Sequence, residues 1–129
     1  MKKIYLIFII ILFLAIILII VFRLEEDSWI KDERGVWIKH GNPSEIPDYV
    51  LQQQQIIKCA LQLYTQEKNN GIEFSSQCLG LCEDYAIDIV NVPRNEEDYK
   101  IENQCEDYKI GRVNHFIEIN KEGDIARII

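Results

Sequence analysis

The sequence predicts an α+β protein that is held to a membrane by its N-terminal helix. Three observations predict this fold class: an unbroken apolar run at residues 4–22, one long amphipathic helical pattern, and alternating strand patterns in the second half of the chain. The predicted domains are a cytoplasmic tip and transmembrane anchor (1–23), a juxtamembrane hairpin or linker (24–42) and one extracytoplasmic α+β domain (43–129). Roughly a hundred residues outside the membrane are enough for one small hydrophobic core.

The apolar run at residues 4–22 contains no Gly, Pro or charged residue. At about 1.5 Å of rise per residue, such a helix reaches roughly 28 Å, which is close to the thickness of a bilayer's hydrocarbon core. A cleaved signal peptide would have an apolar stretch of about 7–15 residues followed by a small-residue cleavage site. The one small residue here, Ala15, is followed by Ile16 and Ile17. We therefore expect a permanent single-pass signal anchor that has the lipid bilayer as its partner.

The charges that flank the run predict its orientation. Lys2 and Lys3 precede it, whereas Arg23 and an acidic triplet at 25–27 follow it. Basic residues near a spanning helix favour the cytoplasm and acids contribute little, so the N-terminus is expected inside the cell and the domain outside. Beyond residue 23, eleven basic residues face twenty-one acidic ones, and this balance argues against nucleic acid and anionic lipid surfaces as partners.

Residues 28–40 repeat the tripeptide Trp-Ile-Lys on either side of a polar turn that contains Gly35. This pattern predicts a short hairpin, in which the two Trp side chains pack across the strands or lie at the membrane interface. His40 is expected to be a turn residue that hydrogen-bonds its own backbone. Trp37, His40 and Asn42 together are a candidate recognition surface.

The segment from Gly35 to Ser44 reads GVWIKHGNPS. It resembles a Gly-x-Trp-x-x-His-Gly-Asn-Pro-Ser segment of uncharacterised single-pass, envelope-exposed small proteins of small-genome archaea and candidate-phylum bacteria. The tract from Cys59 to Arg112 resembles the body of a small anchored family of the same kind. The resemblance implies an extracytoplasmic setting and no particular activity. Relatives often carry a Cys in the first hairpin strand, where this chain has Lys31, so a bridge at that place is not expected.

Residues 43–71 carry the clearest helical pattern. Start signals stand at 43–45 and, as an alternative, at 47–48, and a stop signal stands at 69–71. The apolar side chains between them share one face at helical spacing: Ile46, Val50, Ile57, Ala60, Leu61 and Tyr64. We expect this face to pack on a sheet. Cys59 lies off the centre of the face, from where its sulfur can reach a neighbouring loop.

Three strands are predicted after the helix. Residues 85–92 are apolar on both faces apart from two positions and are expected to form the most buried strand. Residues 113–120 alternate and pair with residues 125–129 across a polar turn. These segments predict a small antiparallel sheet of about three strands with the helix across one face. Residues 94–111 are expected to be a long acidic connection.

The chain has four cysteines, namely Cys59, Cys78, Cys82 and Cys105. An even number in a small domain on the oxidising side of a membrane predicts two disulfides, each worth typically about 2–4 kcal/mol. Three pairings are possible; we favour Cys59 with Cys78 and Cys82 with Cys105, because Cys82 and Cys105 each precede a Glu-Asp-Tyr. A zinc site would show closely spaced pairs twice, and this chain has one such pair in a predicted loop. No metal or cofactor is expected.

His115 and the acidic residues of the stretch 83–107 are further candidates for a functional role. His115 lies in an apolar alternation, so a core or interstrand histidine is favoured over a catalytic base or metal ligand. Acidic residues crowd the stretch 83–107, where Glu96, Glu97 and Asp98 could contribute to a weak calcium site. No EF-hand spacing is present, so a solvated acidic loop is favoured.

The sequence predicts a non-enzymatic module that binds a protein partner in the cell envelope or supports an envelope assembly. No phosphate-binding Gly-rich loop, nucleophile elbow or zinc-protease motif is present. Two alternatives stay open. One is a thiol-redox or other envelope enzyme that uses Cys78 or Cys82, and the other is a pilin-like structural subunit.

Overall fold

The computed structural model describes residues 2–24 and 27–129. The chain divides into an N-terminal unit, Met1–Ile30 with Ile38–Ile46, and a globular unit, Lys31–Trp37 with Pro47–Ile129. The charged side chains from which the orientation is predicted, those of Lys2, Lys3, Arg23, Glu25 and Glu26, lie outside what the structure describes.

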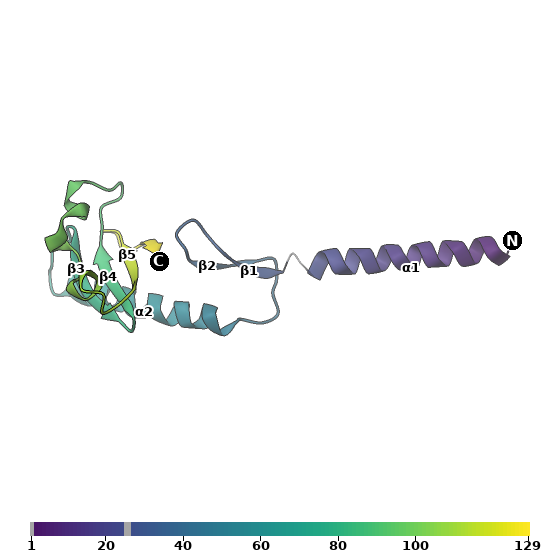
Figure 1. Ribbon diagram of the computed structural model, residues 1–129, viewed down its shortest axis with the longest axis horizontal. Coiled ribbons are helices and arrows are strands. Elements are labelled where there is room, and N and C mark those ends of the chain that lie inside the picture. Colours follow the sequence, from purple (N-terminus) through teal and green to yellow (C-terminus); the bar gives the residue numbers. More distant parts are fainter. Residues whose placement is uncertain (1, 25–26) are drawn as a thin grey trace. The chain divides into compact units, whose positions relative to one another are not determined.

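The N-terminal unit is dominated by helix α1, which runs over Lys2–Leu24 (Figure 1). Its stretch Ile4–Val21 is long and apolar enough to cross a membrane, and none of it is buried within the protein. Length and composition of this kind fit a transmembrane helix or a signal sequence. The predicted N-terminal apolar helix is therefore confirmed.

Strands β1 (Ser28–Lys31) and β2 (Trp37–His40) form a two-stranded sheet, which confirms the predicted hairpin. In the N-terminal unit, the Trp29 indole donates a hydrogen bond to the carbonyl of Glu45 at 3.0 Å. In the globular unit, the Asp32 carboxylate accepts hydrogen bonds from the backbone amides of Arg34 and Val36, both at 3.0 Å. These bonds fix the turn at the tip of the hairpin.

Helix α2 runs over Asp48–Asn69 and begins directly after Pro47, as the second of the two predicted start signals requires. Its buried residues are Val50, Gln53, Ile56, Ala60 and Tyr64. The expected apolar face is right in part, because Ile57 and Leu61 are only half-buried and Ile46 is exposed and precedes the helix. Gln53 takes a buried place instead, since the oxygen and the nitrogen of its side-chain amide each make a hydrogen bond to the hairpin tip.

The sheet of the globular unit has four strands in the order β3-β4-β5-β6. The strands are β3 (Gln77–Cys82), β4 (Tyr85–Ile89), β5 (His115–Ile119) and β6 (Ile125–Ile128). The pairs β3–β4 and β5–β6 are antiparallel, whereas β4 and β5 are parallel.

The predicted three-stranded antiparallel sheet is therefore wrong in two respects. The expected loop around Cys78 and Cys82 is strand β3, and the connection from 90 to 114 crosses over, so that β5 runs beside β4 in the same direction. That connection contains three short helices, η1 (Glu96–Tyr99), η2 (Ile101–Asn103) and α3 (Glu106–Lys109). The class α+β, with one long helix packed on a small sheet, is confirmed.

The two faces of the sheet are covered differently. Helix α2 covers one face, where the core contains the four isoleucines Ile87, Ile89, Ile117 and Ile119, all almost fully buried. On the other face a smaller cluster joins Ala86 of β4 to Cys105 and Val113 of the connection. We call this second face the open face, because the connection covers only part of it.

Two disulfides brace the globular unit, Cys59–Cys82 and Cys78–Cys105, and they use all four cysteines of the chain. The expected number of bridges is right, and the favoured pairing is wrong. The reason is a register shift between Cys78 and Gly80 in the β3–β4 pair. Without it, residues four apart on a strand would point to the same face; the shift sends them to opposite faces. Cys82 therefore reaches helix α2, and Cys78 reaches the connection.

Candidate functional site

The globular unit contains two candidate sites. The first, which we call the Trp37 pocket, has a volume of about 340 Å³. It is lined by residues of the hairpin tip, helix α2, the β3–β4 turn and the start of β5: Lys31, Trp37, Tyr49, Gln52, Gln53, Ile56, Glu83, Asp84, Tyr85 and His115.

One wall of the Trp37 pocket is aromatic. The rings of Trp37 and Tyr49 lie 4.7 Å apart at a tilt of 52°, and the ammonium of Lys31 lies 5.2 Å from the centre of the Trp37 ring. Gln53 of α2 fixes the tip, because its carbonyl accepts from the Trp37 amide at 2.7 Å and its amino group donates to the Gly35 carbonyl at 2.9 Å. The buried glutamine thus orients the indole that the sequence marks for recognition.

The opposite wall is acidic and comes from the β3–β4 turn. Asp84 Oδ2 lies 3.0 Å from Nδ1 of His115, and the His115 ring stacks on Tyr85 with centroids 4.9 Å apart. Burial raises the pKa of Tyr85, and the charges of Asp84 and Glu83 raise it further. Glu83 has a φ of 53°, in the left-handed region that residues other than Gly rarely adopt.

His115 is an interstrand histidine, which is one of the two environments predicted for it, and not a core histidine. Its side chain is 47% exposed, and it stands at the first position of β5, opposite Tyr85 of the parallel neighbour. The buried positions of this strand begin further on, at Ile117. The alternation extends past the edge of the core, so the predicted interstrand position of His115 is right and the predicted core position is wrong.

The structure divides the expected recognition surface between the two units. Trp37 belongs to the globular unit, whereas His40 and Asn42 belong to the N-terminal unit. His40 is the last residue of β2 and is exposed. The side-chain oxygen of Asn42 accepts a hydrogen bond from Lys39 at 3.1 Å, and the backbone amide of Asn42 donates to the Asp27 carboxylate at 2.8 Å. The structure therefore does not describe these three residues as one surface.

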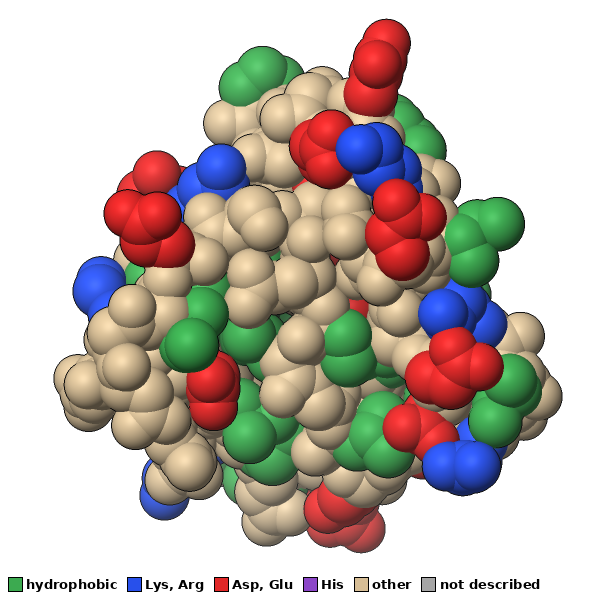
Figure 2. All heavy atoms as spheres, turned by 90° about the vertical axis from the view of Figure 1, so that its left-hand side faces the viewer, with side chains coloured by type: hydrophobic (Ala, Val, Ile, Leu, Met, Phe, Trp, Pro, Cys, Tyr) green, Lys and Arg blue, Asp and Glu red, His purple; other side chains and the backbone are tan. Residues whose placement is uncertain are grey.

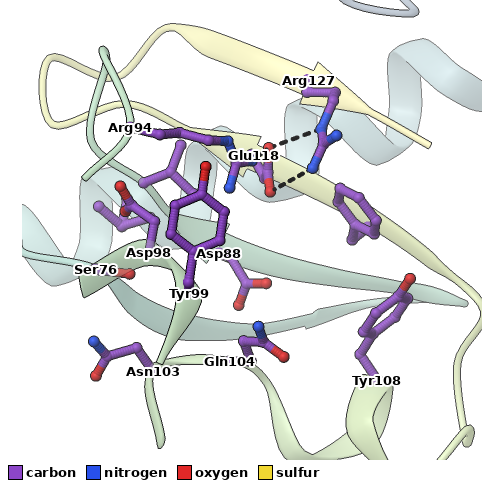
Figure 3. Close-up of a pocket in the computed structure, with 13 residues that line it drawn as sticks. Ser76, Asp88, Arg94, Asp98, Tyr99, Asn103, Gln104, Tyr108, Glu118 and Arg127 are labelled. Carbon is purple, nitrogen blue, oxygen red and sulfur yellow. Dashed lines mark hydrogen bonds and ion pairs between the residues drawn. The ribbon is translucent and has the colours of Figure 1, made fainter. Parts of the chain in front are cut away.

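The second site, which we call the Asp88 pocket, is a cavity of about 240 Å³ between the open face of the sheet and the connection (Figure 3). A row of four residues crosses this face, one from each strand: Cys78, Asp88, Glu118 and Arg127. Each stands opposite the next in the strand register. Residues opposite one another on the same face lie within contact distance.

Glu118 is buried, and two arginines pair with its carboxylate. Arg127 donates to its two carboxylate oxygens at 3.0 and 3.1 Å, and Arg94 from the connection pairs with it from the other side. Figure 3 shows both guanidinium groups converging on this carboxylate above Tyr99. A buried carboxylate needs such partners, because an unpaired buried charge is strongly destabilising.

Asp88, unlike Glu118, has no arginine paired with its carboxyl group among the described residues. Its Oδ1 atom is buried and has no hydrogen-bond partner among the described residues. The pKa of Asp88 is raised from 3.8 to about 6, mainly by burial and also by the charge of Glu118. The backbone amide of Cys105 and the charge of Arg94 act in the opposite direction. This carboxyl group can therefore gain and lose a proton near neutral pH.

Asp98, in the acidic stretch, has a structural task. Its carboxylate accepts hydrogen bonds from the Asn91 amide, the Asn91 side chain and the Asn95 amide at 2.8–3.0 Å. Burial alone would raise the pKa of Asp98, and these hydrogen bonds lower it below its usual value. Its neighbours Glu96 and Glu97 are exposed, as expected of a solvated acidic loop.

One group of potential metal ligands has its atoms within 4.8 Å of one another among the described residues: Cys78, Asp88 and Cys105. Because the two sulfurs are joined in a disulfide, they cannot act as thiolate ligands. On the face drawn in Figure 2, most of the Lys and Arg side chains lie beside acidic ones, and no basic patch forms among the residues drawn there.

Sequence reasoning missed Asp88 and Glu118 as site residues. The signal that could have found them is a carboxylate inside an otherwise apolar strand pattern, since such residues are almost never buried without a partner. Comparisons with protein-family models, curated proteins and solved structures gave no match to this chain.

Proposed function

We propose that the protein is a membrane-anchored, extracytoplasmic module that binds a basic segment of a partner protein in the Trp37 pocket, without catalysing a reaction on it. Helix α1 would be a single-pass anchor through residues 4–22, with the N-terminus in the cytoplasm, because the flanking charges favour that orientation. The observation that carries the proposal is the pairing of an aromatic wall with an acidic wall in one pocket.

The aromatic wall suits a cationic ligand group. The face of an indole ring attracts ammonium and guanidinium groups that lie within about 6 Å of its centre. Lys31 of the chain already occupies such a position over Trp37. Because Lys31 is exposed, a lysine or arginine of the partner can take its place with little loss of buried contact.

The acidic wall supplies the opposing charge. Glu83 and Asp84 are both exposed, and the described partner of the Asp84 side chain is the weak base His115. A residue other than Gly in the left-handed region costs about 1–2 kcal/mol, so a Gly would serve the turn at Glu83 better. That a glutamate stands there supports a role for its side chain.

The charge of the whole domain acts in the same direction. Eleven basic residues face twenty-one acidic ones beyond residue 23. A domain of that charge attracts basic partners over long distances and raises their association rate at low salt. Binding in the Trp37 pocket should therefore weaken as ionic strength increases.

The test uses the full chain in detergent micelles with Trp29 replaced by Phe, so that the remaining indole fluorescence reports on Trp37. Titration with a short lysine-rich peptide should give a saturable fluorescence change. The same peptide with acetylated lysines should bind at least about tenfold more weakly, because acetylation removes the charge. Absence of saturation, or equal binding of the two peptides, would refute the proposal.

Variants locate the binding. The double variant Glu83→Gln, Asp84→Asn should weaken peptide binding by about tenfold, in line with two lost charge contacts. The matched control, Glu96→Gln with Glu102→Gln, removes two exposed acids of the connection that do not line the pocket. If the control weakens binding as much as the pocket variant, the peptide is recognised by net charge and not by this pocket.

A further inference from the structure

We infer that the Cys78–Cys105 disulfide is an exchangeable bridge, which accepts two electrons from a dithiol, and that Asp88 supplies the proton that Cys105 takes up. The inference concerns the open face of the sheet and does not rest on the proposed binding in the Trp37 pocket. It is carried by the unequal exposure of the two cysteines that the bridge joins and by the position of a carboxyl group beside their sulfurs.

The two bridges differ in their accessibility. In the Cys78–Cys105 bridge, Cys78 is exposed, whereas Cys105 is only 1% exposed. In the other bridge, Cys82 is 2% exposed, and Cys59 is a half-buried residue of helix α2 packed against the core. Thiol–disulfide exchange requires that a thiolate reach one sulfur of the bridge. Cys78 is the residue that an incoming thiolate can reach.

Asp88 is placed to serve that bridge. It stands directly opposite Cys78 in the β3–β4 register, and a carboxylate oxygen of Asp88 and both bridge sulfurs lie within 4.8 Å of one another. Its Oδ1 is buried and accepts no hydrogen bond from the described residues. The Asp88 carboxyl group thus has an oxygen without a hydrogen-bond partner among the described residues, in a group that lies beside the two sulfurs.

The surroundings of Cys105 make a proton necessary. Its sulfur lies 3.5 Å from the carbonyl oxygen of Ile87 and 3.7 Å from that of Gly80. A thiolate at this position would face two carbonyl oxygens in a buried site and would be unfavourable. A thiol, in contrast, can donate its S–H to either carbonyl. Opening of the bridge should therefore be coupled to protonation of Cys105.

The exchange balances in two steps. A thiolate of the dithiol attacks Cys78 Sγ; the bond between the two sulfurs breaks, its electron pair goes to Cys105, and the carboxylic acid of Asp88 transfers its proton to that sulfur. The second thiolate of the dithiol then attacks the first sulfur of the same dithiol, which is bonded to Cys78 in the mixed disulfide. This attack releases Cys78 as a thiolate, which solvent protonates. The dithiol is oxidised to a disulfide, the bridge is reduced to two thiols, and solvent returns a proton to Asp88.

The charged and titratable groups around Asp88 set the pH range of this step. Glu118 faces it from β5 and Arg127 from β6, and the connection contributes Arg94, Asp98, Tyr99 and Tyr108 to the same cavity. With burial as the largest cause, the pKa of Asp88 is raised to about 6. The carboxylic acid that the step requires is thus abundant below pH 6 and becomes scarce above it.

The first experiment compares the two bridges in the unaltered full chain in micelles. The protein is exposed to dithiothreitol for increasing times, quenched with acid, alkylated and mapped by mass spectrometry. Cys78 and Cys105 should become alkylated at least about tenfold faster than Cys59 and Cys82, in line with their unequal access. With glutathione as a monothiol probe, the adduct should form on Cys78. Equal opening of the bridges, or an adduct on Cys105, would overturn the inference.

The second experiment tests the proton donor through a pH profile. The rate constant for opening, corrected for the fraction of ionised dithiol, should be roughly tenfold lower at pH 7 than at pH 5, as the protonated fraction of Asp88 falls with a pKa of about 6. Asp88→Asn should abolish this pH dependence, whereas the control Glu122→Gln, at an exposed residue that lines neither pocket, should keep it. A pH step that survives in Asp88→Asn would rule out the proton transfer, and the comparison of the two bridges stays decisive if that variant fails to fold.

Discussion

Replacement of Gly35 by Ala should release the hairpin tip that holds Trp37. Gly35 has a φ of +84°, and a Cβ added there would lie 2.4 Å from the backbone oxygen of Ile128 in β6. The clash cannot be relieved by a side-chain movement, because the atom that it meets is backbone. The tip or strand β6 must therefore move.

The cost follows from the contacts that this movement breaks. The tip is held by three hydrogen bonds: Ile128 N to Arg34 O at 2.7 Å, Gln53 Nε2 to Gly35 O at 2.9 Å, and Trp37 N to Gln53 Oε1 at 2.7 Å. At about 1 kcal/mol each, their loss amounts to about 3 kcal/mol. The left-handed conformation adds about 1–2 kcal/mol for Ala. We expect the free energy of unfolding to fall by about 4–5 kcal/mol.

Two other glycines provide matched controls. Gly71 and Gly111 have φ values of +80° and +71°, and an added Cβ would meet nothing within 4 Å at either position. Ala at these positions should therefore cost only about 1–2 kcal/mol. Urea denaturation of the full chain in micelles measures all three variants, and amide exchange of Ile128 reports on the tip. If Gly35→Ala lowers the free energy of unfolding no more than the controls do, the described packing of the hairpin tip against β6 is incorrect.

Three further changes probe the globular unit. Asp88→Asn should raise the free energy of unfolding at pH 8 by up to about 3 kcal/mol and have little effect at pH 4. The reason is that a folded-state pKa of about 6 makes the stability of the unaltered protein fall as the pH rises from about 4 to 6. Urea titrations at both pH values test this. Glu118→Ala, which removes a carboxylate 9% exposed and leaves two arginines unpaired, should cost about 3 kcal/mol, whereas Glu97→Ala, at a pair about half exposed, should cost at most about 1 kcal/mol. The double replacement of Cys59 and Cys82 by Ala should cost about 3 kcal/mol by calorimetry, since it opens a loop with a sequence separation of 23 residues.

The elements that carry a clear period could be predicted from the sequence. The apolar helix, the hairpin, helix α2 from Pro47 onward, and the strands at 85, 115 and 125 all follow from the spacing of apolar residues or from turn signals. Strand β3 has no such signal, because QCLGLC combines a Gly with cysteines in place of β-branched residues. Its omission led to the wrong number of strands.

The pairing of the cysteines depends on a feature that local sequence does not encode. A single register shift between Cys78 and Gly80 decides which face of the sheet each cysteine occupies, and it arises from the pairing with β4. The parallel pairing of β4 with β5 is likewise a tertiary choice made by the connection. The row that crosses the open face needs both features, so the sequence indicates its carboxylates and not their arrangement.

The most direct test of the account is a map of the disulfides in protein purified from membranes with free thiols blocked at lysis. Digestion at Leu79 and Leu81 separates Cys78 from Cys82, so that mass spectrometry can assign each link. Cys59 should be linked to Cys82 and Cys78 to Cys105, as in the fold described above. Links of Cys59 to Cys78 and of Cys82 to Cys105 would contradict the register of the sheet, and four blocked thiols would contradict the oxidising setting.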